Sequence, residues 1–91
     1  MSKRVPKKLL AQISAMVPSD AEVVALDFHY EDEDYNIAVF VGEATDRAVL
    51  QNDLYDLIFS YDDVHGTSSL CYVWPKSERP YIVSGSKAAP S

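Results

Sequence analysis

Carboxylates and histidines that lie close together in a sequence can hold a divalent metal ion, and this chain offers two such groups. Asp62, Asp63 and His65 fall in one short segment, and Asp27 and His29 share one face of an expected strand. The chain contains no HExxH, no paired CxxC and no calcium-loop spacing. An exposed Asp-Asp-x-His-Gly segment is usually an ordinary turn. We therefore predict no metal and no other cofactor.

Nucleophilic and phosphate-binding chemistry has little support in the sequence. The single cysteine, Cys71, lies within an expected strand without a neighbouring base, which is typical of a small core residue. Glycine occurs only at positions 42, 66 and 85, so no phosphate-cradling loop or dinucleotide fingerprint can form. A carboxylate-based nuclease needs cations to hold phosphate, and residues 9–75 contain only Arg47. We therefore predict that the chain is not an enzyme.

Negative charge interleaved with tyrosine is the chemistry that the sequence does concentrate. Tyr30 and Tyr35 flank four consecutive acids, Tyr55 lies between two aspartates, and Tyr61 precedes two more. Tyrosine offers a stiff contact area with a polar tip, and clustered carboxylates speed association with a cationic surface. A tyrosine can instead close the edge of a core, which we expect for Tyr61 and Tyr72. The residues that we predict to bind a partner are Tyr30, Glu31, Asp32, Glu33, Asp34, Tyr35, Asp53, Tyr55, Asp56, Asp62 and Asp63.

Charge is distributed very unevenly along the chain, whose formal net charge is −6. Residues 1–8 carry four cations and no acid, whereas residues 9–75 carry thirteen acids against one base, a net charge of −12. A body of that charge repels phosphate and anionic lipid and attracts cationic surfaces. We therefore predict a basic protein partner, no direct binding to nucleic acid and no binding to membranes.

The length of 91 residues predicts one domain with a modest core. The lone cysteine forms no intramolecular disulfide, which suits a reducing cytoplasm. The apolar run after the basic N-terminus is interrupted by Gln12 and Ser14, unlike a signal peptide, and no stretch is long enough to cross a bilayer. We predict a cytoplasmic domain over residues 1–83 with a flexible tail at 84–91.

The first half of the chain predicts a helix and two strands. Apolar residues recur at helical spacing between Pro6 and Pro18. Alternating apolar residues predict strands at Glu22–Tyr30 and Tyr35–Val41, and the acids between them form the connection of an antiparallel hairpin. In the second strand, one face is expected to hold Ile37, Val39 and Val41, and the other Ala38 and Phe40.

The second half predicts a helix from about Asp46 to Tyr61, with Thr45 as its N-cap. Asp62 and Asp63 then follow the helix at the negative end of its dipole, where carboxylates are unfavourable. A strand is expected at Ser69–Trp74. The residues expected to face the core are Leu50, Leu54, Leu57, Ile58 and Tyr61, broadened by Val49 and Phe59, while Gln51, Asn52, Asp53, Asp56 and Ser60 face water.

This order of elements, α-β-β-α-β with an optional edge strand at Tyr81–Val83, predicts an α+β fold. We expect two helices packed on one face of a three- to four-stranded antiparallel sheet. The opposite face should then be partly exposed to water.

In its size, acidity, lone cysteine and Tyr/Asp runs, such as Tyr30–Tyr35 and Asp53–Asp56, the chain resembles the immunity proteins of bacterial toxin–immunity pairs. The resemblance lies in the whole-chain profile and not in a motif. It implies a small, cytoplasmic, non-catalytic inhibitor that covers the cationic cleft of a basic, nuclease-type toxin.

Two other classes of function remain open. An acidic adaptor or subunit, such as a DNA mimic acting on nucleic-acid-handling machinery, would need carboxylates spaced like duplex phosphates along a ridge. A small metal-binding enzyme would need further ligands to converge on the Asp62–His65 segment. We expect a monomer or a homodimer, and dimerisation would favour the DNA mimic because one copy offers only a short ridge.

Overall fold

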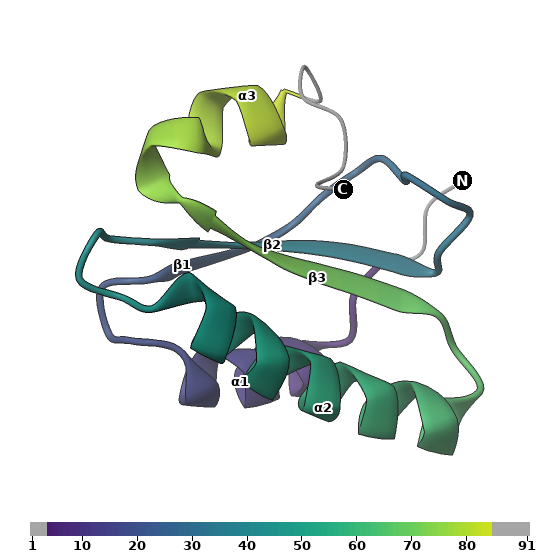
Figure 1. Cartoon of the computed structure of the whole chain (residues 1–91). Helices are drawn as coiled ribbons and strands as arrows, with labels where there is room; N and C mark the ends of the chain where they lie inside the picture. Colours follow the sequence, from purple (N-terminus) through teal and green to yellow (C-terminus); the bar gives the residue numbers. More distant parts are fainter. Residues whose placement is uncertain (1–3, 85–91) are drawn as a thin grey trace.

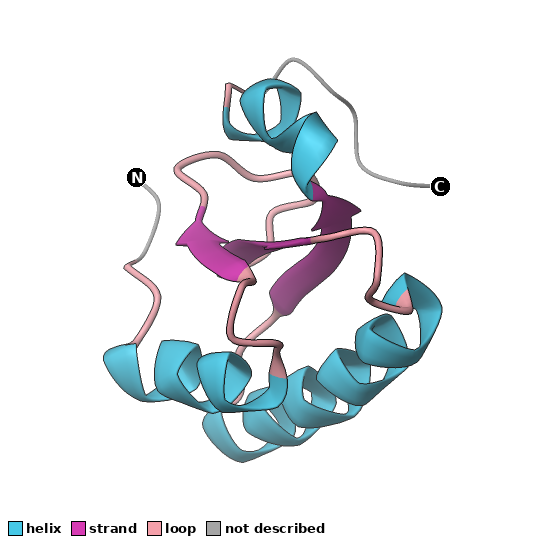
Figure 2. Ribbon diagram, turned by 90° about the vertical axis from the view of Figure 1, so that its left-hand side faces the viewer, coloured by secondary structure: helices cyan, strands magenta, loops and turns pink. Residues whose placement is uncertain are grey.

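A three-stranded sheet lies between a pair of helices and a short third helix in the computed structural model, which describes residues 4–84. Figure 2 shows these three layers along the sheet. The chain is α+β, as predicted. The elements are α1 (Lys7–Met16), β1 (Glu22–Ala25), β2 (Tyr35–Val41), α2 (Arg47–His65), β3 (Ser69–Pro75), a 3₁₀ turn (Lys76–Glu78) and α3 (Arg79–Val83).

The sheet is mixed, with the strand order β1-β2-β3. β1 runs antiparallel to β2, but β3 runs parallel to it, pairing Tyr35 with Ser69 and Val41 with Pro75. The prediction of an antiparallel sheet is therefore wrong for β3. The reason is the crossover: α2 has 19 residues and spans about 28 Å, so it returns the chain to the end of the sheet where β2 began.

β2 is the centre of the core, because all seven of its residues are buried. Ile37, Val39 and Val41 face α1 and α2, and pack with core residues of those helices such as Leu9 and Leu54. The alternate residues of β2 pack in a second cluster that comprises Leu26, Ala38, Phe40, Trp74 and Ile82. The predicted division of β2 into two faces is confirmed, and α1 and α2 do share one face of the sheet (Figure 1).

Two predicted strands are wrong in extent or type. β1 ends at Ala25, because Leu26 and Phe28 turn into the second cluster and the backbone leaves the ladder before the predicted end at Tyr30. The optional edge strand at Tyr81–Val83 is helical instead. It forms α3 and covers the second face of the sheet with Ile82, which is fully buried. Of the predicted tail, all but Ser84 lies outside the described residues.

α2 begins and ends at other residues than predicted. Asp46, and not Thr45, is the N-cap, and its Oδ1 accepts the N–H groups of Ala48 and Val49 at 3.1 and 3.2 Å. The helix continues to His65 and ends at Gly66, whose φ of 64° lies in the left-handed region that glycine adopts without strain. Asp62 and Asp63 therefore belong to the last turns of the helix.

Replacement of the true cap should destabilise the protein. We expect Asp46→Ala to lower the free energy of unfolding by about 1 kcal/mol, because two N–H groups lose their acceptor. Thr45→Ala is the matched control and should change little. Urea unfolding followed by circular dichroism measures both, and a larger loss for Thr45→Ala would contradict this assignment of the cap.

Candidate protein-binding surface

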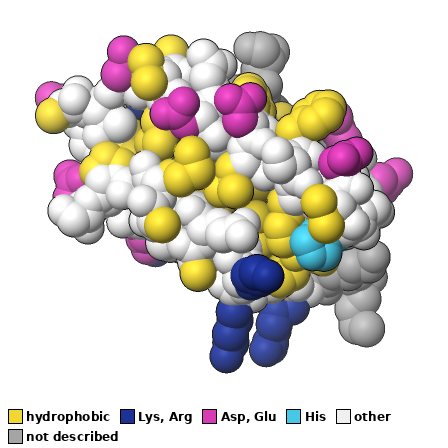
Figure 3. Space-filling view, turned by 90° about the horizontal axis from the view of Figure 1, so that it is seen from below, with side chains coloured by type: hydrophobic (Ala, Val, Ile, Leu, Met, Phe, Trp, Pro, Cys, Tyr) yellow, Lys and Arg dark blue, Asp and Glu magenta, His cyan; other side chains and the backbone are white. Residues whose placement is uncertain are grey.

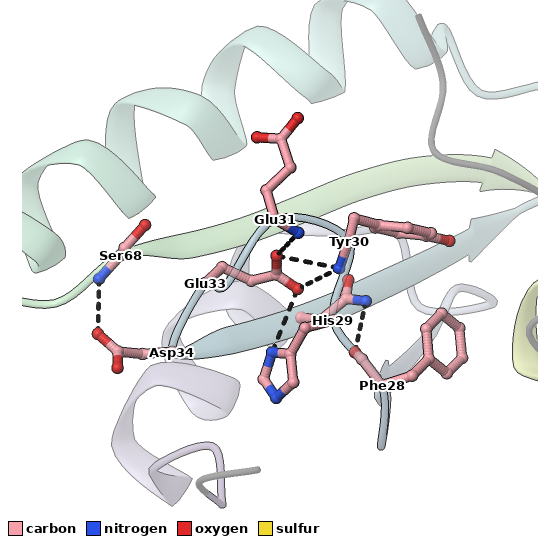
Figure 4. Close-up of polar contacts among 8 residues, drawn as sticks. Phe28, His29, Tyr30, Glu31, Glu33, Asp34 and Ser68 are labelled. Atoms are coloured by element: carbon pink, nitrogen blue, oxygen red, sulfur yellow. Dashed lines mark hydrogen bonds and ion pairs between the residues drawn. The ribbon is translucent and has the colours of Figure 1, made fainter. Parts of the chain in front are cut away.

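The segment of four acids forms a tight loop around one buried carboxylate (Figure 4). Glu33, only 4% exposed, accepts the N–H of Tyr30 at 2.8 Å and that of Glu31 at 2.6 Å. Its Oε2 lies 3.2 Å from His29 Nδ1. Burial alone would raise the pKa of Glu33, but the two N–H groups and the imidazole hold that pKa below its usual value. Glu33 therefore organises the loop from inside.

The residues after Glu33 also serve the fold. Asp34 Oδ2 accepts the N–H of Ser68 at 3.0 Å, and the N–H of Asp34 donates to the Ser68 carbonyl at 2.6 Å. These bonds join the loop to the chain just before β3. Tyr35 is buried in the core. The prediction that Glu33 and Tyr35 contact a partner is therefore wrong, because neither side chain reaches the surface, and Asp34 has a structural role.

Two side chains of α2 bind the outer edge of β3. The Gln51 amide behaves like a neighbouring strand: its Oε1 accepts the N–H of Val73 at 2.8 Å and its Nε2 donates to the Cys71 carbonyl at 2.6 Å. The second of these side chains is that of Asp62, which binds Ser69, the first residue of β3. The expectation that Gln51 faces water is wrong, since its amide satisfies two backbone groups at an otherwise open strand edge.

Asp62, like Gln51, binds polar groups of β3 and of the turn before it. Its carboxylate accepts the N–H of Ser69 at 2.9 Å, the hydroxyl of Ser69 at 2.8 Å and the hydroxyl of Thr67 at 2.7 Å. These bonds explain why a carboxylate occupies the negative end of a helix dipole, which otherwise disfavours it. Asp62 was predicted to bind a partner, and most of its acceptor capacity is instead used within the fold.

The outer side of α2 carries the acids that remain available. Asp53, Asp56 and Asp63 are exposed. Phe59 is 80% exposed among them and Val49 is 56% exposed, so the prediction that these two broaden the buried stripe is wrong. We call Val49, Asp53, Tyr55, Asp56, Phe59 and Asp63 the outer surface of α2.

Sequence reasoning missed Phe59, although a signal was present. Each step along a helix turns it by about 100°, so Phe59 cannot share a face with both Leu54 and Ile58. An apolar residue outside the buried stripe of a helix is therefore a candidate contact residue.

The acidic loop and α2 meet at the edge of β3, around Tyr72. The rings of Tyr30 and Tyr72 lie 6.3 Å apart. Burial raises the pKa of Tyr72, and its neighbours Tyr55, Glu31 and Glu33 raise it further. Of the predicted residues, Tyr30 therefore lies against this edge of the sheet. Asp32 is exposed in the same loop, at a φ of 59° that Asp tolerates better than most residues.

A shallow hollow lies farther along α2. It measures about 240 Å³ and is lined by Phe59, Asp62, Asp63 and Thr67. Its lining combines the exposed carboxylate of Asp63 and the negative charge of Asp62 with an aromatic ring, and includes no Lys or Arg. It therefore suits a cationic side chain that binds Asp63 while its apolar stem lies against the ring.

The two groups of candidate metal ligands do not converge. His65 Nδ1 lies 2.9 Å from the Tyr61 carbonyl oxygen, and its ring stacks on that of Tyr61 at 4.0 Å. His29 faces Glu33. Within residues 4–84, no three side chains of His, Cys, Asp or Glu are grouped so that they could hold a metal ion.

Two further findings concern reactivity and membranes. Burial raises the pKa of the Cys71 thiol to about 12, so the reactive thiolate is scarce at neutral pH. Among the helices of residues 4–84, none combines the length and the apolar character needed to cross a bilayer.

Comparison of the chain with protein-family models, with curated proteins and with solved structures finds no match. The interpretation of this surface therefore rests on its own geometry.

Loss of the Asp62 carboxylate should weaken the fold. We expect Asp62→Ala to lower the free energy of unfolding by about 1–3 kcal/mol, because one N–H and two hydroxyl groups lose their acceptor. Asp63→Ala, the adjacent exposed residue, should stay within about 0.5 kcal/mol of the parent. Chemical denaturation of both variants measures the difference, and equal losses would show that Asp62 does not act as a cap.

Glu33 should make the free energy of unfolding depend on pH in the acidic range. Its pKa is lower in the folded chain than the usual value of 4.5, so the unfolded chain binds the proton more readily. The stabilisation is therefore present above about pH 4.5 and is lost as the pH falls through the folded-state pKa. The parent should exceed Glu33→Gln in stability at pH 7, and the gap should narrow towards about pH 3. Glu31→Gln is the exposed control, and a gap of constant size for Glu33→Gln would refute the role given to this carboxylate.

Proposed function

We propose that this chain is a non-catalytic acidic protein that binds a basic protein partner through the outer surface of α2. The single observation that carries the proposal is Phe59, which is 80% exposed on a regular helix with Asp56 and Asp63 on the neighbouring turns. The partner class that we propose, from the resemblance in sequence profile, is a nuclease-type toxin, with this chain as its cytoplasmic immunity protein.

The exposure of Phe59 supports a protein contact because it is costly in isolation. Burying a side chain of this size stabilises by roughly 1.5–3 kcal/mol relative to leaving it in water. The opposite side of α2 packs Leu50, Leu54 and Ile58 into the core, so the helix is held rigidly and presents the ring at a fixed place. Rigid exposed aromatics are typical anchors of protein interfaces.

Among residues 4–84, no ion pair joins an acid of this surface to a cation. Of the ion pairs among the described residues, the two with Lys or Arg lie elsewhere: Arg79 Nε lies 2.6 Å from Glu22 Oε1, and Lys76 Nζ lies 3.9 Å from Asp20 Oδ2. Asp53, Asp56 and Asp63 are therefore left uncompensated by those cations. Two copies that met through this surface would set like charges against each other, which is costly at an interface. A cationic partner relieves the repulsion.

The mixture of acids and apolar groups also bears on the kind of partner. A chain that mimicked duplex phosphates alone would need regularly spaced carboxylates and would gain nothing from Phe59 and Val49. A protein cleft that binds nucleic acid supplies both cations and apolar walls. The surface thus supports an inhibitor that occupies such a cleft in place of nucleic acid.

The decisive test is binding to the product of the toxin-like reading frame expected next to the gene for this chain. We expect the parent chain to bind that protein and to suppress its toxicity in co-expression. Phe59→Ala should weaken binding by about 2 kcal/mol or more, roughly thirtyfold, because it removes the anchor. Tyr81→Ala, which removes an aromatic that is 57% exposed on α3, is the matched control and should bind normally.

A salt series resolves the role of charge in the same complex. The double variant Asp56→Asn/Asp63→Asn should associate more slowly than the parent at low salt and depend less on ionic strength. Equal binding by the Phe59→Ala and parent chains, or absence of any complex with the neighbouring product, would refute the proposal.

A further inference from the structure

A groove between α1 and α2 lies on the other flank of the outer surface. It measures about 250 Å³ and opens to solvent on the face shown in Figure 3, where hydrophobic side chains separate Lys and Arg at one border from Asp and Glu at the other. The floor is apolar, because Leu57 and Tyr61 are packed against the core below it. The residues that line the groove are Lys8, Gln12, Leu57, Ser60, Tyr61, Val64 and His65.

The groove differs in charge from the outer surface of α2. Its lining includes Lys8 and His65 and no carboxylate. Lys8 lies in the first turn of α1, which contains no acid and whose N-cap, Pro6, provides no side-chain acceptor. The positive end of the α1 dipole therefore lies at Lys8, whereas the negative end of the α2 dipole lies at His65, so the positive potential of the groove is concentrated at Lys8. The hollow at Phe59, Asp62 and Asp63 has the reverse composition, so α2 separates two hollows of opposite sign.

Hydrogen-bond donors in the groove are available to a ligand. Within residues 4–84, the side chains of Lys8, Gln12 and Ser60 make no hydrogen bond that would occupy them. His65 is fixed by its stack on Tyr61, with an interplanar angle of 15°, and its Nδ1 faces the Tyr61 carbonyl oxygen. The carbonyl oxygen only accepts, so Nδ1 carries the proton and Nε2 of the neutral ring is an acceptor. The donors available to a ligand are therefore Lys8, Gln12 and Ser60. A cation and neutral donors above an apolar floor suit a carboxylate attached to an apolar group.

We propose that this groove accepts an Asp or Glu side chain of the partner, with an apolar side chain of the partner beside it on the floor formed by Leu57 and Tyr61. This inference rests on the proposed function, and charge complementarity selects the occupant. A helix with its side chains is about 10–12 Å across, so a protein seated on the outer surface of α2 also overhangs the groove. A partner that presents a cation to the Phe59 hollow and a carboxylate to Lys8 would then fit in one orientation only.

A peptide probe tests the groove without the partner. We expect acetyl-Leu-Asp-Leu-amide to shift the NMR signals of Tyr61 and His65 saturably, and acetyl-Leu-Asn-Leu-amide to bind at least fivefold more weakly. Lys8→Glu should lower the affinity of the chain for the Asp peptide by a similar factor. Lys7→Glu changes an exposed neighbour outside the lining and should leave the affinity for the Asp peptide unchanged. Lys8→Met removes the positive charge without adding a negative one and should lower this affinity as well.

Three results would overturn the inference. They are equal binding of the Asp and Asn peptides, tighter binding of inorganic phosphate than of the Asp peptide, and a dimer in sedimentation that Lys8→Glu dissociates, which would make a second copy the occupant. Failure of the proposed function has a separate readout, because Phe59→Ala would then bind the neighbouring toxin-like product as well as the parent does, whatever the peptides do.

Discussion

The attachment of α2 to the outer edge of β3 is the constraint on which the rest of the structure depends. An edge strand exposes backbone groups that invite further pairing. Here Gln51 satisfies Cys71 and Val73, and Asp62 satisfies Ser69, so the helix lies along the edge at two points about three turns apart. With that side fixed, the buried stripe of α2 is fixed against β2, and the opposite side of the helix must face outwards. The position of Phe59 follows from this.

The acids of the chain divide into two kinds by what they accept. Asp46, Glu33 and Asp62 each receive backbone N–H groups. Asp46 begins α2, Asp62 binds the first residue of β3, and Glu33 holds the loop before β2. Asp53, Asp56 and Asp63 are exposed on one helix and are not engaged by the ion pairs of Arg79 and Lys76. The strong negative charge of the chain therefore has a structural part and a surface part. Only the surface part can attract a partner.

Opposite charges on the two flanks of α2 restrict the orientation in which a charged protein can bind. A uniformly acidic surface would attract any cation-rich protein in many orientations, because charge alone is not selective in angle. Under the proposed function, a partner must match three features: the acidic hollow, the Phe59 ring that lines it, and the cationic groove on the other flank of α2. Such an arrangement gives specificity in two ways: favourable contacts strengthen binding of the matching partner, and like charges weaken binding of other proteins.

Local pattern alone determined several parts of this protein. The alternation of β2 into two faces and the stripe of Leu50, Leu54 and Ile58 were both readable, because each depends on the period of a strand or a helix. The exposure of Asp53 and Asp56 was readable for the same reason.

Tertiary structure decided what depends on contacts between distant segments. The direction of β3 follows from the path of α2 across the sheet, and the helical state of Tyr81–Val83 follows from the apolar face that Ile82 covers. The bonds of Gln51 to Cys71 and Val73 join groups that lie far apart in the sequence and that only the folded chain brings near. Glu33 and Asp62 bind groups close in sequence, but a carboxylate reaches them only where the backbone of the folded chain turns back towards it. No pattern in the sequence distinguishes such a carboxylate from Asp63, because both have the same chemistry and only their neighbours differ.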